Sequence, residues 1–409
     1  MYDASFHKKT LSRELRRSDF SEASKLIDEE VLNSVIEAAV RRAKDGFFDI
    51  QLSVSQLRKK AIYKVDELSD QLVLRKIGRN VRRLTGVKQS NRDSIIRSIR
   101  AILSEGVSYN VFKADIRDFY ESVSVENLLD QLNGDAGFSR ESLRILRSFF
   151  LALKEEDIVG LPRGIALSAT LSEYVMRPFD RAALKIPSAY FYARFVDDIL
   201  LITTDEVKPD EITSILRKSL PIGLVLNHSK TKCVKFNGAI LKKSDDEKIE
   251  NSFDYLGYRF SVCNRKKQND GRISRNVYLD LAPKKVSRIK TRIVKSIEDY
   301  LAAKQFDLLL NRIQTLTGNY NIYDYEKGVR RNSGLYCNYR LMNAGRSEAL
   351  PELDRFWRGI ILSKLRGSLT PTERRRLLKV NFVSSYKSKT FYHFSPTKLA
   401  KLVRCWTYA

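Results

Sequence analysis

The chain has 409 residues, and its 74 lysines and arginines exceed its 49 aspartates and glutamates by 25. This excess is unusual for an ordinary metabolic enzyme. It indicates a polyanionic partner, because Lys and Arg contacts to phosphates release condensed counterions. Nucleic acid is the leading candidate and an anionic membrane surface the lesser one. With 43% apolar and 10% aromatic residues, the composition excludes a disordered or fibrous protein and predicts two or three packed domains.

The cysteines and histidines show no spacing typical of a zinc site. Four cysteines lie far apart along the chain, at 233, 263, 337 and 405, and none of the three histidines, at 7, 228 and 393, lies near them in a zinc-type spacing. We therefore expect neither a metal-cysteine site nor a disulfide scaffold, and a reducing, cytoplasmic setting. The first residues are charged and the apolar runs are short, so neither export nor membrane insertion is expected.

The N-terminal part is predicted to be helical. Residues 21–44 have the spacing of an amphipathic helix that ends at Asp45-Gly46, and a second helical stretch is predicted over 55–74. A basic segment follows over 75–100, which is either a solvated charged face or a binding surface. Its cationic residues are Arg75, Lys76, Arg79, Arg82, Arg83, Lys88, Arg92, Arg97 and Arg100.

The central part predicts a mixed α/β unit. Residues 111–116 alternate as in a β-strand, with Asp115 near its end. Helices are then predicted over 124–132, 139–154, 167–177 and 211–219. A loop is expected at Gly160–Gly164, and further strands near Val225 and over 253–260.

Two β-prone apolar runs over 189–203 are interrupted by Asp197 and Asp198, which predicts a hairpin with carboxylates at its tip.

Beyond Asn264 the chain becomes polar and basic, and 265–275 is predicted to be a boundary or loop. From Pro283 onward the chain is predicted to be almost wholly helical. The first of these helices carries a basic stripe opposite an apolar one, so one face is expected to pack and the other to offer charge to a partner or to solvent. The basic positions are Lys284, Arg288, Arg292 and Lys295, and the apolar ones are Val286, Ile289, Ile293 and Ile297.

Three acids carry the chemistry. If the strand and the hairpin share a sheet, Asp115, Asp197 and Asp198 converge at one point. Adjacent acids in a turn are usually only turn residues, but these are flanked by apolar runs, where unpaired charge would cost several kcal/mol. Mg²⁺ prefers carboxylate oxygens as ligands. Two such ions, about 4 Å apart, can bind the attacking and the leaving oxygens of a phosphoryl displacement. The cluster therefore indicates phosphodiester formation or cleavage.

An ordered series of motifs resembles the palm motifs of reverse transcriptases, most closely those of the prokaryotic branch that includes retron and defence-associated enzymes. The resemblance covers about residues 75–260, and two C-terminal stretches, 282–285 and 334–339, are similar with less specificity. The motifs, in chain order, are Ala114-Asp115-Ile116-Arg117-Asp118-Phe119-Tyr120-Glu121-Ser122, Gly160-Leu161-Pro162-Arg163-Gly164, Phe195-Val196-Asp197-Asp198, Leu226-Asn227-His228-Ser229-Lys230-Thr231 and Phe253-Asp254-Tyr255-Leu256-Gly257-Tyr258.

The resemblance implies an α+β, right-hand polymerase fold. It divides the chain into an N-terminal helical region (1–74), a basic fingers segment (75–110), a palm (111–262, with helices over 124–154) and a thumb with a helical C-terminal region (263–409). It also implies that Asp115, Asp197, Asp198 and the Ile116 carbonyl hold two Mg²⁺ ions, with Mn²⁺ as a substitute.

The same resemblance assigns five nucleotide-binding residues, of which Ile116, through its carbonyl, serves the ion that carries the triphosphate. Tyr120 matches the ring that excludes a ribose 2′-hydroxyl, with a core aromatic as the alternative. Arg163 stands where the family has Gln, so its role is open between triphosphate, template and RNA partner. Lys230 matches a lysine near the pyrophosphate, or is a surface lysine. Arg82, ten residues before Arg92, matches an arginine of the fingers that contacts triphosphate.

The function implied is RNA-directed DNA polymerase activity, on a dedicated noncoding RNA, in bacterial antiphage defence. The implied partners are RNA, the DNA product and deoxynucleoside triphosphates, without a membrane, and with a homo-oligomer or a partner protein left open. Two alternatives remain: untemplated or protein-primed synthesis by the same site, and a non-catalytic RNA-binding scaffold. The scaffold predicts loss of Asp115 or Asp197, and both are present.

Overall fold

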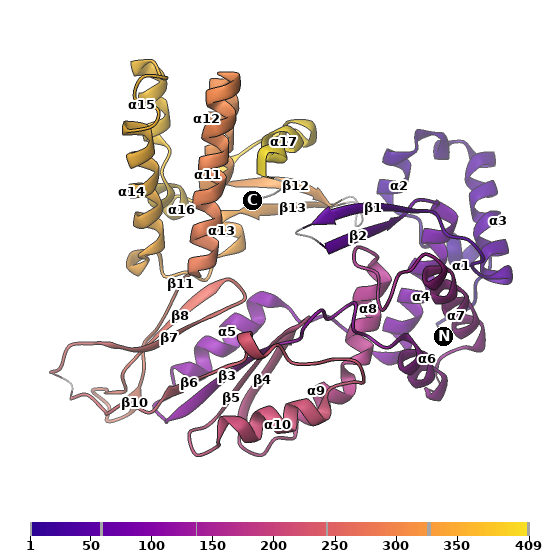
Figure 1. Ribbon diagram of the computed structural model, residues 1–409, viewed down its shortest axis with the longest axis horizontal. Coiled ribbons are helices and arrows are strands. Elements are labelled where there is room, and N and C mark those ends of the chain that lie inside the picture. Colours follow the sequence, from indigo (N-terminus) through magenta and orange to yellow (C-terminus); the bar gives the residue numbers. More distant parts are fainter. Residues whose placement is uncertain (1, 58–59, 136, 243, 325–328, 407–409) are drawn as a thin grey trace. The chain divides into compact units, whose positions relative to one another are not determined.

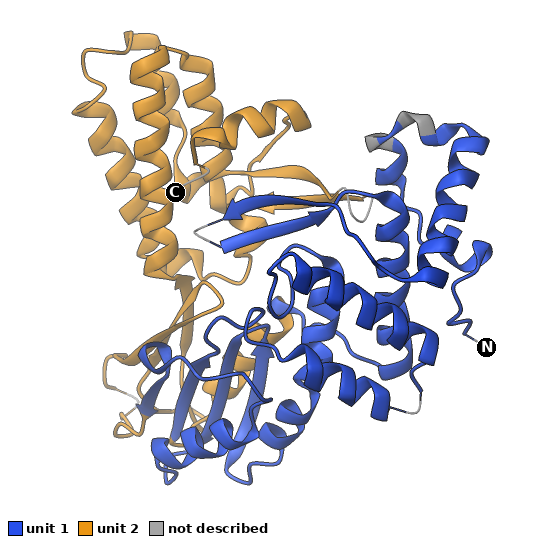
Figure 2. Cartoon of the chain, turned by 45° about the vertical axis from the view of Figure 1, so that its right-hand side comes forward, with its two compact units in different colours: residues 1–92, 109–235 blue, residues 93–108, 236–409 orange. Residues whose placement is uncertain are grey.

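The structure is a computed structural model that describes residues 2–57, 60–135, 137–242, 244–324 and 329–406. The chain forms two compact units (Figure 2): unit 1 comprises residues 1–92 and 109–235, and unit 2 comprises 93–108 and 236–409. Both contain helices and strands, so the α+β class is confirmed. The boundaries of fingers, palm and thumb stay predictions.

Unit 1 joins a four-stranded sheet and a hairpin to a set of helices (Figure 1). Its elements are α1 (Lys8–Ser12), α2 (Arg17–Glu22), η1 (Ser24–Ile27), α3 (Glu29–Asp45), β1 (Leu52–Leu57), β2 (Lys60–Val65), α4 (Leu68–Thr85), β3 (Tyr109–Asp115), α6 (Val125–Gly134), α7 (Arg140–Glu155), α8 (Ala166–Val175), α9 (Arg177–Leu184), β4 (Ala189–Phe195), β5 (Asp198–Thr204), α10 (Pro209–Ser219), η2 (His228–Lys230) and β6 (Lys232–Phe236).

The sheet of unit 1 has the strand order β4-β5-β3-β6, and β5 pairs antiparallel with both β4 and β3. The apolar run Ile199–Ile202 of β5 is fully buried, because neighbouring strands and layers cover both of its faces. Helix α9 packs against β4, and α10 packs against α9 (Figure 1). The predicted strand over 111–116 and the predicted hairpin over 189–203 are confirmed.

The first predicted helix, over 21–44, begins later than expected. A 3-10 turn precedes α3, and the Asp28 carboxylate accepts a hydrogen bond from the Glu30 N–H at 2.9 Å. This side-chain cap satisfies a backbone donor that the first turn of the helix leaves without a partner. The cap therefore fixes the start of α3 at Glu29.

The second predicted helix, over 55–74, is wrong in its first half. Strands β1 and β2 form an antiparallel hairpin, with Leu52 opposite Val65 and Leu57 opposite Lys60; residues 58–59 lie outside the described part. Apolar and polar residues alternate over 52–55, which is a short strand signal. Helix α4 begins only at Leu68.

The basic segment over 75–100 lies on α4 and α5, and part of it is used inside the protein. Arg75 pairs with Asp19 at 2.7 Å, and Arg79 pairs with Glu14 at 2.9 Å. Lys76 is buried. These three cations therefore help to hold the N-terminal segment against α4.

Unit 2 combines three small sheets with the C-terminal helices (Figure 1). Its elements are α5 (Arg92–Leu103), β7 (Ile249–Tyr255), β8 (Tyr258–Cys263), β9 (Lys266–Lys267), β10 (Ile273–Ser274), β11 (Val277–Leu281), α11 (Pro283–Ala303), α12 (Phe306–Thr317), β12 (Asn319–Asp324), β13 (Val329–Gly334), α13 (Leu335–Asn338), η3 (Ala344–Arg346), α14 (Ala349–Leu362), α15 (Pro371–Lys379), α16 (Phe382–Lys387), β14 (Phe391–Tyr392), α17 (Pro396–Val403) and η4 (Arg404–Trp406).

The prediction that the chain is almost wholly helical after Pro283 is wrong. Strand β12 pairs antiparallel with β13 and parallel with β14, which forms a three-stranded sheet among the helices. Polar and larger apolar or aromatic residues alternate along Asn319–Asp324, as in a strand. Residues 325–328 and 407–409 of this predicted stretch lie outside the described residues.

Four smaller differences follow from local breaks. The helix predicted over 167–177 is α8, which ends at Val175, and a second helix, α9, begins at Arg177 with Pro178 in its first turn. The segment near Val225 contributes a single bridge, Ile116 to Leu226, instead of a strand. The strand predicted over 253–260 is the hairpin β7–β8, and the loop predicted over 265–275 contains β9 and β10.

Helix α11 has the predicted apolar face, since Val286, Ile293 and Ile297 are buried. On the basic side, the Arg292 guanidinium lies 5.4 Å from the ring centroid of Trp406, so one cation of the stripe packs inside unit 2. Among the described residues, no helix is long and apolar enough to cross a membrane.

Candidate active site

The three acids lie at one end of the sheet in unit 1. Asp115 is the last residue of β3, and in the strand register it lies directly opposite Asp198, the first residue of β5. Asp197 occupies the turn between β4 and β5, and its carbonyl accepts a hydrogen bond from the Ile116 N–H at 3.2 Å. The structure thus places Asp115, Ile116, Asp197 and Asp198 together.

The hairpin turn that carries Asp197 is strained. Phe195 pairs with Asp198, which leaves Val196 and Asp197 as a two-residue turn. Val196 has a φ of 60°, a left-handed conformation that a β-branched side chain rarely adopts. Strain of this kind persists only where the surroundings stabilise it.

Arg194 supplies that stabilisation. Its guanidinium donates to the Val196 carbonyl at 3.0 Å and pairs with Glu173 at 2.7 Å and with Asp180 at 2.8 Å. Burial alone would lower the pKa of Arg194, but the hydrogen bonds to Asp180 and Glu173 raise it. Arg194 therefore stays charged in the interior and ties the turn to α8 and α9.

The acids repel one another. Burial, followed by the charges of Asp197 and Asp115, raises the pKa of Asp198 to about 6. Burial also raises the pKa of Asp197, with the charge of Asp115 adding to the effect. A positive charge at this end of the sheet would relieve this repulsion.

Lys230 provides one such charge. Its Nζ lies 2.9 Å from both carboxylate oxygens of Asp115, and the hydrogen bond to that carboxylate raises the pKa of Lys230. The backbone holds this arrangement, because the Asn227 N–H donates to the Asp115 carbonyl at 2.7 Å just before η2.

The chemistry of these side chains fits a hard divalent cation, since buried carboxylate oxygens are the ligands that Mg²⁺ prefers and their shared charge is only partly balanced by Lys230. Across the ranges that the structure describes, however, no three His, Cys, Asp or Glu side chains are already gathered as a metal site.

A second group of predicted residues lines a cavity of about 490 Å³. Tyr120 and Arg163 lie on it together, and the Arg163 guanidinium is 5.1 Å from the centroid of the Tyr120 ring. The negative charge of Asp197 contributes to raising the pKa of both Tyr120 and Arg163. Asp197 therefore lies close to this cavity.

Two glycines allow the loop over 160–164 to approach this closely. Gly160 and Gly164 both have positive φ, and a Cβ on either would lie 2.5 Å from a backbone oxygen, that of Tyr120 or of Tyr63. Only glycine fits such contacts without a shift of the backbone. The loop is therefore held between the end of β3 and the hairpin β1–β2, where the Tyr63 N–H donates to the Arg163 carbonyl at 2.7 Å.

Arg163 is already paired. Its guanidinium donates to both carboxylate oxygens of Glu121, at 2.7 and 3.0 Å. The hydrogen bond from Arg163 lowers the pKa of Glu121 to about 2. Lys60, which lines the same cavity, contacts Asp118 at 2.5 Å and Glu121 at 3.4 Å.

Arg82 does not join this group. It lies on α4 and donates to the Thr170 hydroxyl at 2.8 Å. It lines a separate cavity of about 100 Å³, which shares only residues 164–166 with the cavity of Tyr120 and Arg163.

Two residues of the site, Lys60 and Arg194, were not predicted from the sequence. Lys60 lies in the stretch predicted to be helical, and its strand, Lys60–Val65, has no clear alternation that would have marked it as a strand. Arg194, a lone cation inside the apolar run before the acids, was a signal that a buried carboxylate would accompany it. Its partners Glu173 and Asp180 could not be chosen from the sequence, because they come from helices that only the fold brings near.

The fold and the site define the class of protein. An α+β chain whose acids lie at the end of a β-strand and on the hairpin beside it, next to a cavity lined by an aromatic ring and cations, has the arrangement of a right-hand polymerase. Residues 55–260, just over half of the chain, match the family model described as reverse transcriptase (RNA-dependent DNA polymerase). The chain belongs to the reverse transcriptase family, which is a family of nucleotidyltransferases.

The chain is also similar to solved structures. A solved structure of apo telomerase from Candida tropicalis, truncated from its C-terminal domain, is similar at 13% sequence identity and a TM-score of 0.37. The match covers 57% of this chain and 58% of the telomerase chain. None of the curated proteins matches the chain.

Proposed function

We propose that the chain is an RNA-directed DNA polymerase that adds deoxynucleotides to a 3′-hydroxyl. The observation that carries this proposal is the placement of Asp115, Asp197 and Asp198 at one end of the sheet in a chain of the reverse transcriptase family. The raised pKa values of Asp197 and Asp198 and the Lys230 counter-charge support it further, because an electrostatically unfavourable acidic cluster is typical of a site that works with cations.

Asp115, Asp197, Asp198 and the Ile116 carbonyl are the groups that would hold two Mg²⁺ ions, or Mn²⁺ in their place. When bound, such ions supply positive charge to the attacking and leaving oxygens of a phosphoryl transfer. The chain's own part is to present the carboxylates from a strained turn and to keep Lys230 protonated beside Asp115. A protonated lysine there would donate a proton to the leaving pyrophosphate.

The cavity of Tyr120 and Arg163 is the proposed place of the incoming nucleotide. Its volume, about 490 Å³, lies in the range of about 300 to 1,000 Å³ that small-molecule sites occupy. Tyr120 would exclude a ribose 2′-hydroxyl by bulk, and Lys60 and Arg163 would contact the phosphates once their carboxylate partners release them. Arg82, in its separate cavity, has only the resemblance to support a contact with triphosphate.

The proposal is tested by primer extension on an RNA template with labelled deoxynucleotides. Asp197→Asn should lower incorporation by about 10³-fold or more, because the isosteric amide cannot balance a metal's charge. Asp210→Asn, an exposed acid on α10, serves as the matched control and should keep wild-type activity. Equal incorporation by the wild type and Asp197→Asn would count against the proposal.

Tyr120 provides a test of the sugar preference. Tyr120→Val should raise ribonucleotide use relative to deoxynucleotide use by about 10- to 100-fold, since one lost steric contact changes discrimination by about 1–3 kcal/mol. Tyr120→Phe keeps the ring and should keep the preference. A preference that survives the valine variant would make Tyr120 a core aromatic.

We further propose that the enzyme copies a dedicated noncoding RNA in the cytoplasm as part of antiphage defence. The support is the resemblance of its motifs to the prokaryotic branch that includes retron and defence-associated enzymes. Cells that carry Asp197→Ala should lose protection in a phage challenge. Sequencing of the copurifying nucleic acid, with and without added template, distinguishes this from untemplated or protein-primed synthesis.

A further inference from the structure

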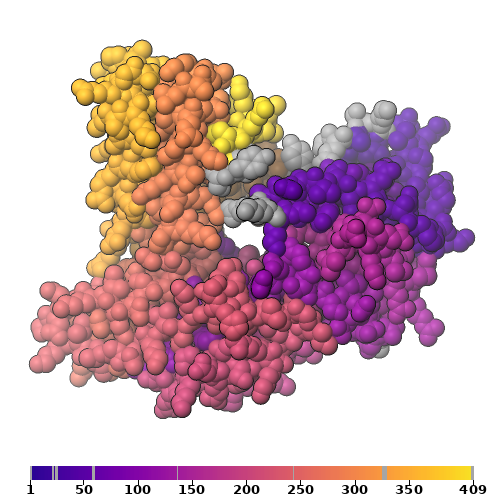
Figure 3. Space-filling model, viewed as in Figure 1, coloured from indigo at the N-terminus to yellow at the C-terminus, as the bar shows by residue number. Residues whose placement is uncertain are grey.

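A cationic pocket lies in unit 2, on a different compact unit from the three acids. It has a volume of about 590 Å³ and is formed by one side of α14 and the length of α16. Helix α14 belongs to the surface of the molecule in Figure 3, where the C-terminal helices appear in golden colours. Three of the residues that line the pocket are cations: Arg355, Arg358 and Lys387.

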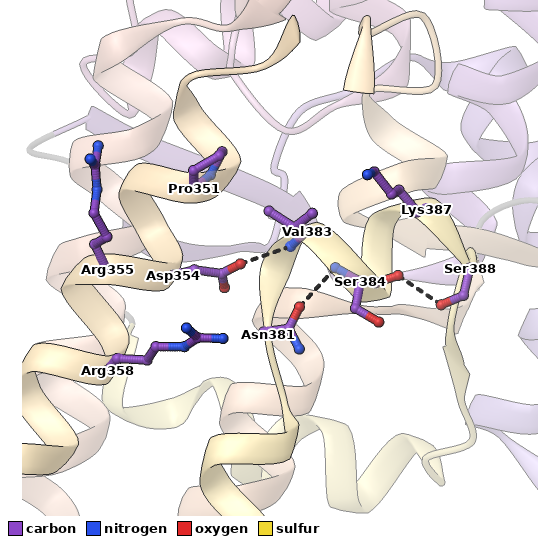
Figure 4. Close-up of a pocket in the computed structure, with 9 residues that line it drawn as sticks. All are labelled: Pro351, Asp354, Arg355, Arg358, Asn381, Val383, Ser384, Lys387 and Ser388. Atoms are coloured by element: carbon purple, nitrogen blue, oxygen red, sulfur yellow. Dashed lines mark hydrogen bonds between the residues drawn. The ribbon is translucent and has the colours of Figure 1, made fainter. Parts of the chain in front are cut away.

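The fold determines that these cations face outward. Helix α14 buries Leu350, Leu353, Trp357 and Ile361, so its opposite face carries Arg355 and Arg358. These two positions are three residues apart, which places them as neighbours on one side of the helix. In Figure 4, Arg358 extends from α14 toward Asn381, and Lys387 lies on α16 across the pocket.

The one acid in the pocket has another role. The Asp354 carboxylate accepts the backbone N–H groups of Phe382 at 2.6 Å and Val383 at 3.1 Å, as Figure 4 shows for Val383. It is buried and joins α14 to the start of α16. Its two oxygens are used in holding the pocket together, so it forms no ion pair with the cations around it.

Within the described ranges, neither Arg355, Arg358 nor Lys387 has an ion-pair partner. Like charges around one pocket repel one another, and an anion would relieve that repulsion. Arginine forks match the oxygens of a phosphate, and the exposed Ser384 and Ser388 add hydroxyls to the same wall. A phosphate group is therefore the chemistry that the pocket suits.

We propose that this pocket binds the phosphodiester backbone of RNA, at a place separate from the site of nucleotide addition. The choice of RNA rests on the proposed function, in which RNA is the polyanion that the protein handles. Pro351 of α14 and Val383 of α16 add apolar groups to the lining of the pocket, against which a sugar can lie. The pocket binds RNA by charge and without sequence specificity, because contacts to phosphate do not distinguish one base from another.

The test measures binding of a fluorescein-labelled hairpin RNA between about 50 and 200 mM KCl. Arg358→Ala combined with Lys387→Ala should weaken binding by roughly tenfold or more, and should reduce the slope of log K against log salt by about 1.5, since each phosphate contact contributes about 0.7–0.9. Arg358→Lys with Lys387 intact keeps the charge and should keep most of the slope.

The matched control removes one lysine and one arginine from the same unit outside the pocket, as Lys364→Ala with Arg375→Ala; both are exposed and neither lines it. A pocket that serves an acidic protein segment would leave RNA binding unchanged in the pocket variant, and this result would overturn the proposal, as would equal weakening by the control. Circular dichroism of each variant checks that it is folded. Binding needs no catalysis, so a wild type that binds RNA through the pocket but extends no primer would count against the polymerase proposal alone.

Discussion

Two cationic regions of this protein differ in what their charges do. Beside the acids of unit 1, Arg194 is buried and divides its donors among Glu173, Asp180 and the Val196 carbonyl. In the α14–α16 pocket of unit 2, Arg358 and Lys387 are exposed and have no ion-pair partner in the described part of the chain. The first region holds a turn in place; the second offers charge to a ligand.

This difference shows that the net charge of +25 does not tell how many cations are free to bind a polyanion. A buried cation must be paired, because an uncompensated charge in the interior is costly. Its partner then determines the shape of the backbone around it. An exposed cation costs little without a partner and keeps its charge for a ligand. Sorting cations by burial and pairing therefore separates structural arginines from binding ones.

The largest effect that would test this division is expected at Arg194. Arg194→Met leaves Glu173 and Asp180 without their cation and should lower the free energy of unfolding by about 3–5 kcal/mol, measured by urea denaturation. Arg194→Lys keeps the charge but cannot reproduce the three-way contact. It should weaken Mn²⁺ binding by about tenfold, read by electron paramagnetic resonance, as outer-sphere positioning residues do.

A Lys variant with wild-type Mn²⁺ affinity would show that Arg194 is structural only and does not position the acids. Arg181→Lys, on the same helix as Asp180, makes the same exchange outside this network and serves as the control.

Lys230 sharpens the comparison, because it is paired and yet its side chain is 57% exposed. Lys230→Met should lower the free energy of unfolding by about 1–3 kcal/mol, since Lys230 is exposed but its partner Asp115 is buried and would lose its cation. It should lower kcat for nucleotide addition by about 10²-fold or more if the lysine donates a proton in the reaction. Lys232→Met, two residues on and exposed, should leave both quantities unchanged. An unchanged kcat in the Lys230 variant would make it a surface lysine.

The smallest effect is expected for the pair of Arg163 and Glu121, each about one third exposed. Because the folded-state pKa of Glu121 is depressed to about 2, its contribution to stability is present above the ordinary pKa near 4.5 and is lost as the pH falls toward 2. The wild type should thus be more stable than Glu121→Gln by less than about 1 kcal/mol at neutral pH, and the difference should vanish in acid. A difference that stays constant over this range would contradict the pairing.

Much of the end of unit 1 that carries the three acids was predictable from the sequence. The run Ile199–Ile202 is apolar and β-prone, and a strand that is buried on both faces has this composition. Asp115, Asp197 and Asp198 adjoin such runs, so their strands and the hairpin were predicted correctly. Gly160 and Gly164 marked a loop whose close approach to neighbouring backbone the structure shows.

The hairpin β1–β2 and the sheet of β12, β13 and β14 were missed. Their strands are short and largely exposed or half-buried, so hydrophobic periodicity gave a weak signal. The ten-residue interval between Arg82 and Arg92 suggested that Arg82 contacts the triphosphate. A spacing along the chain, however, does not determine where a side chain lies in the folded protein. The structure puts it in a different cavity from Tyr120 and Arg163.

The sequence by itself determined which chemistry this protein can carry, because three carboxylates beside apolar strands, a loop bracketed by glycines and a large excess of cations are properties of residue type and order. Only the tertiary structure decided which charges are engaged. Arg75, Arg163 and Arg194 meet carboxylates 56, 42 and 21 residues away along the chain. Such pairs form where packing brings distant segments of the chain into contact. Residue type and order do not show which segments will meet.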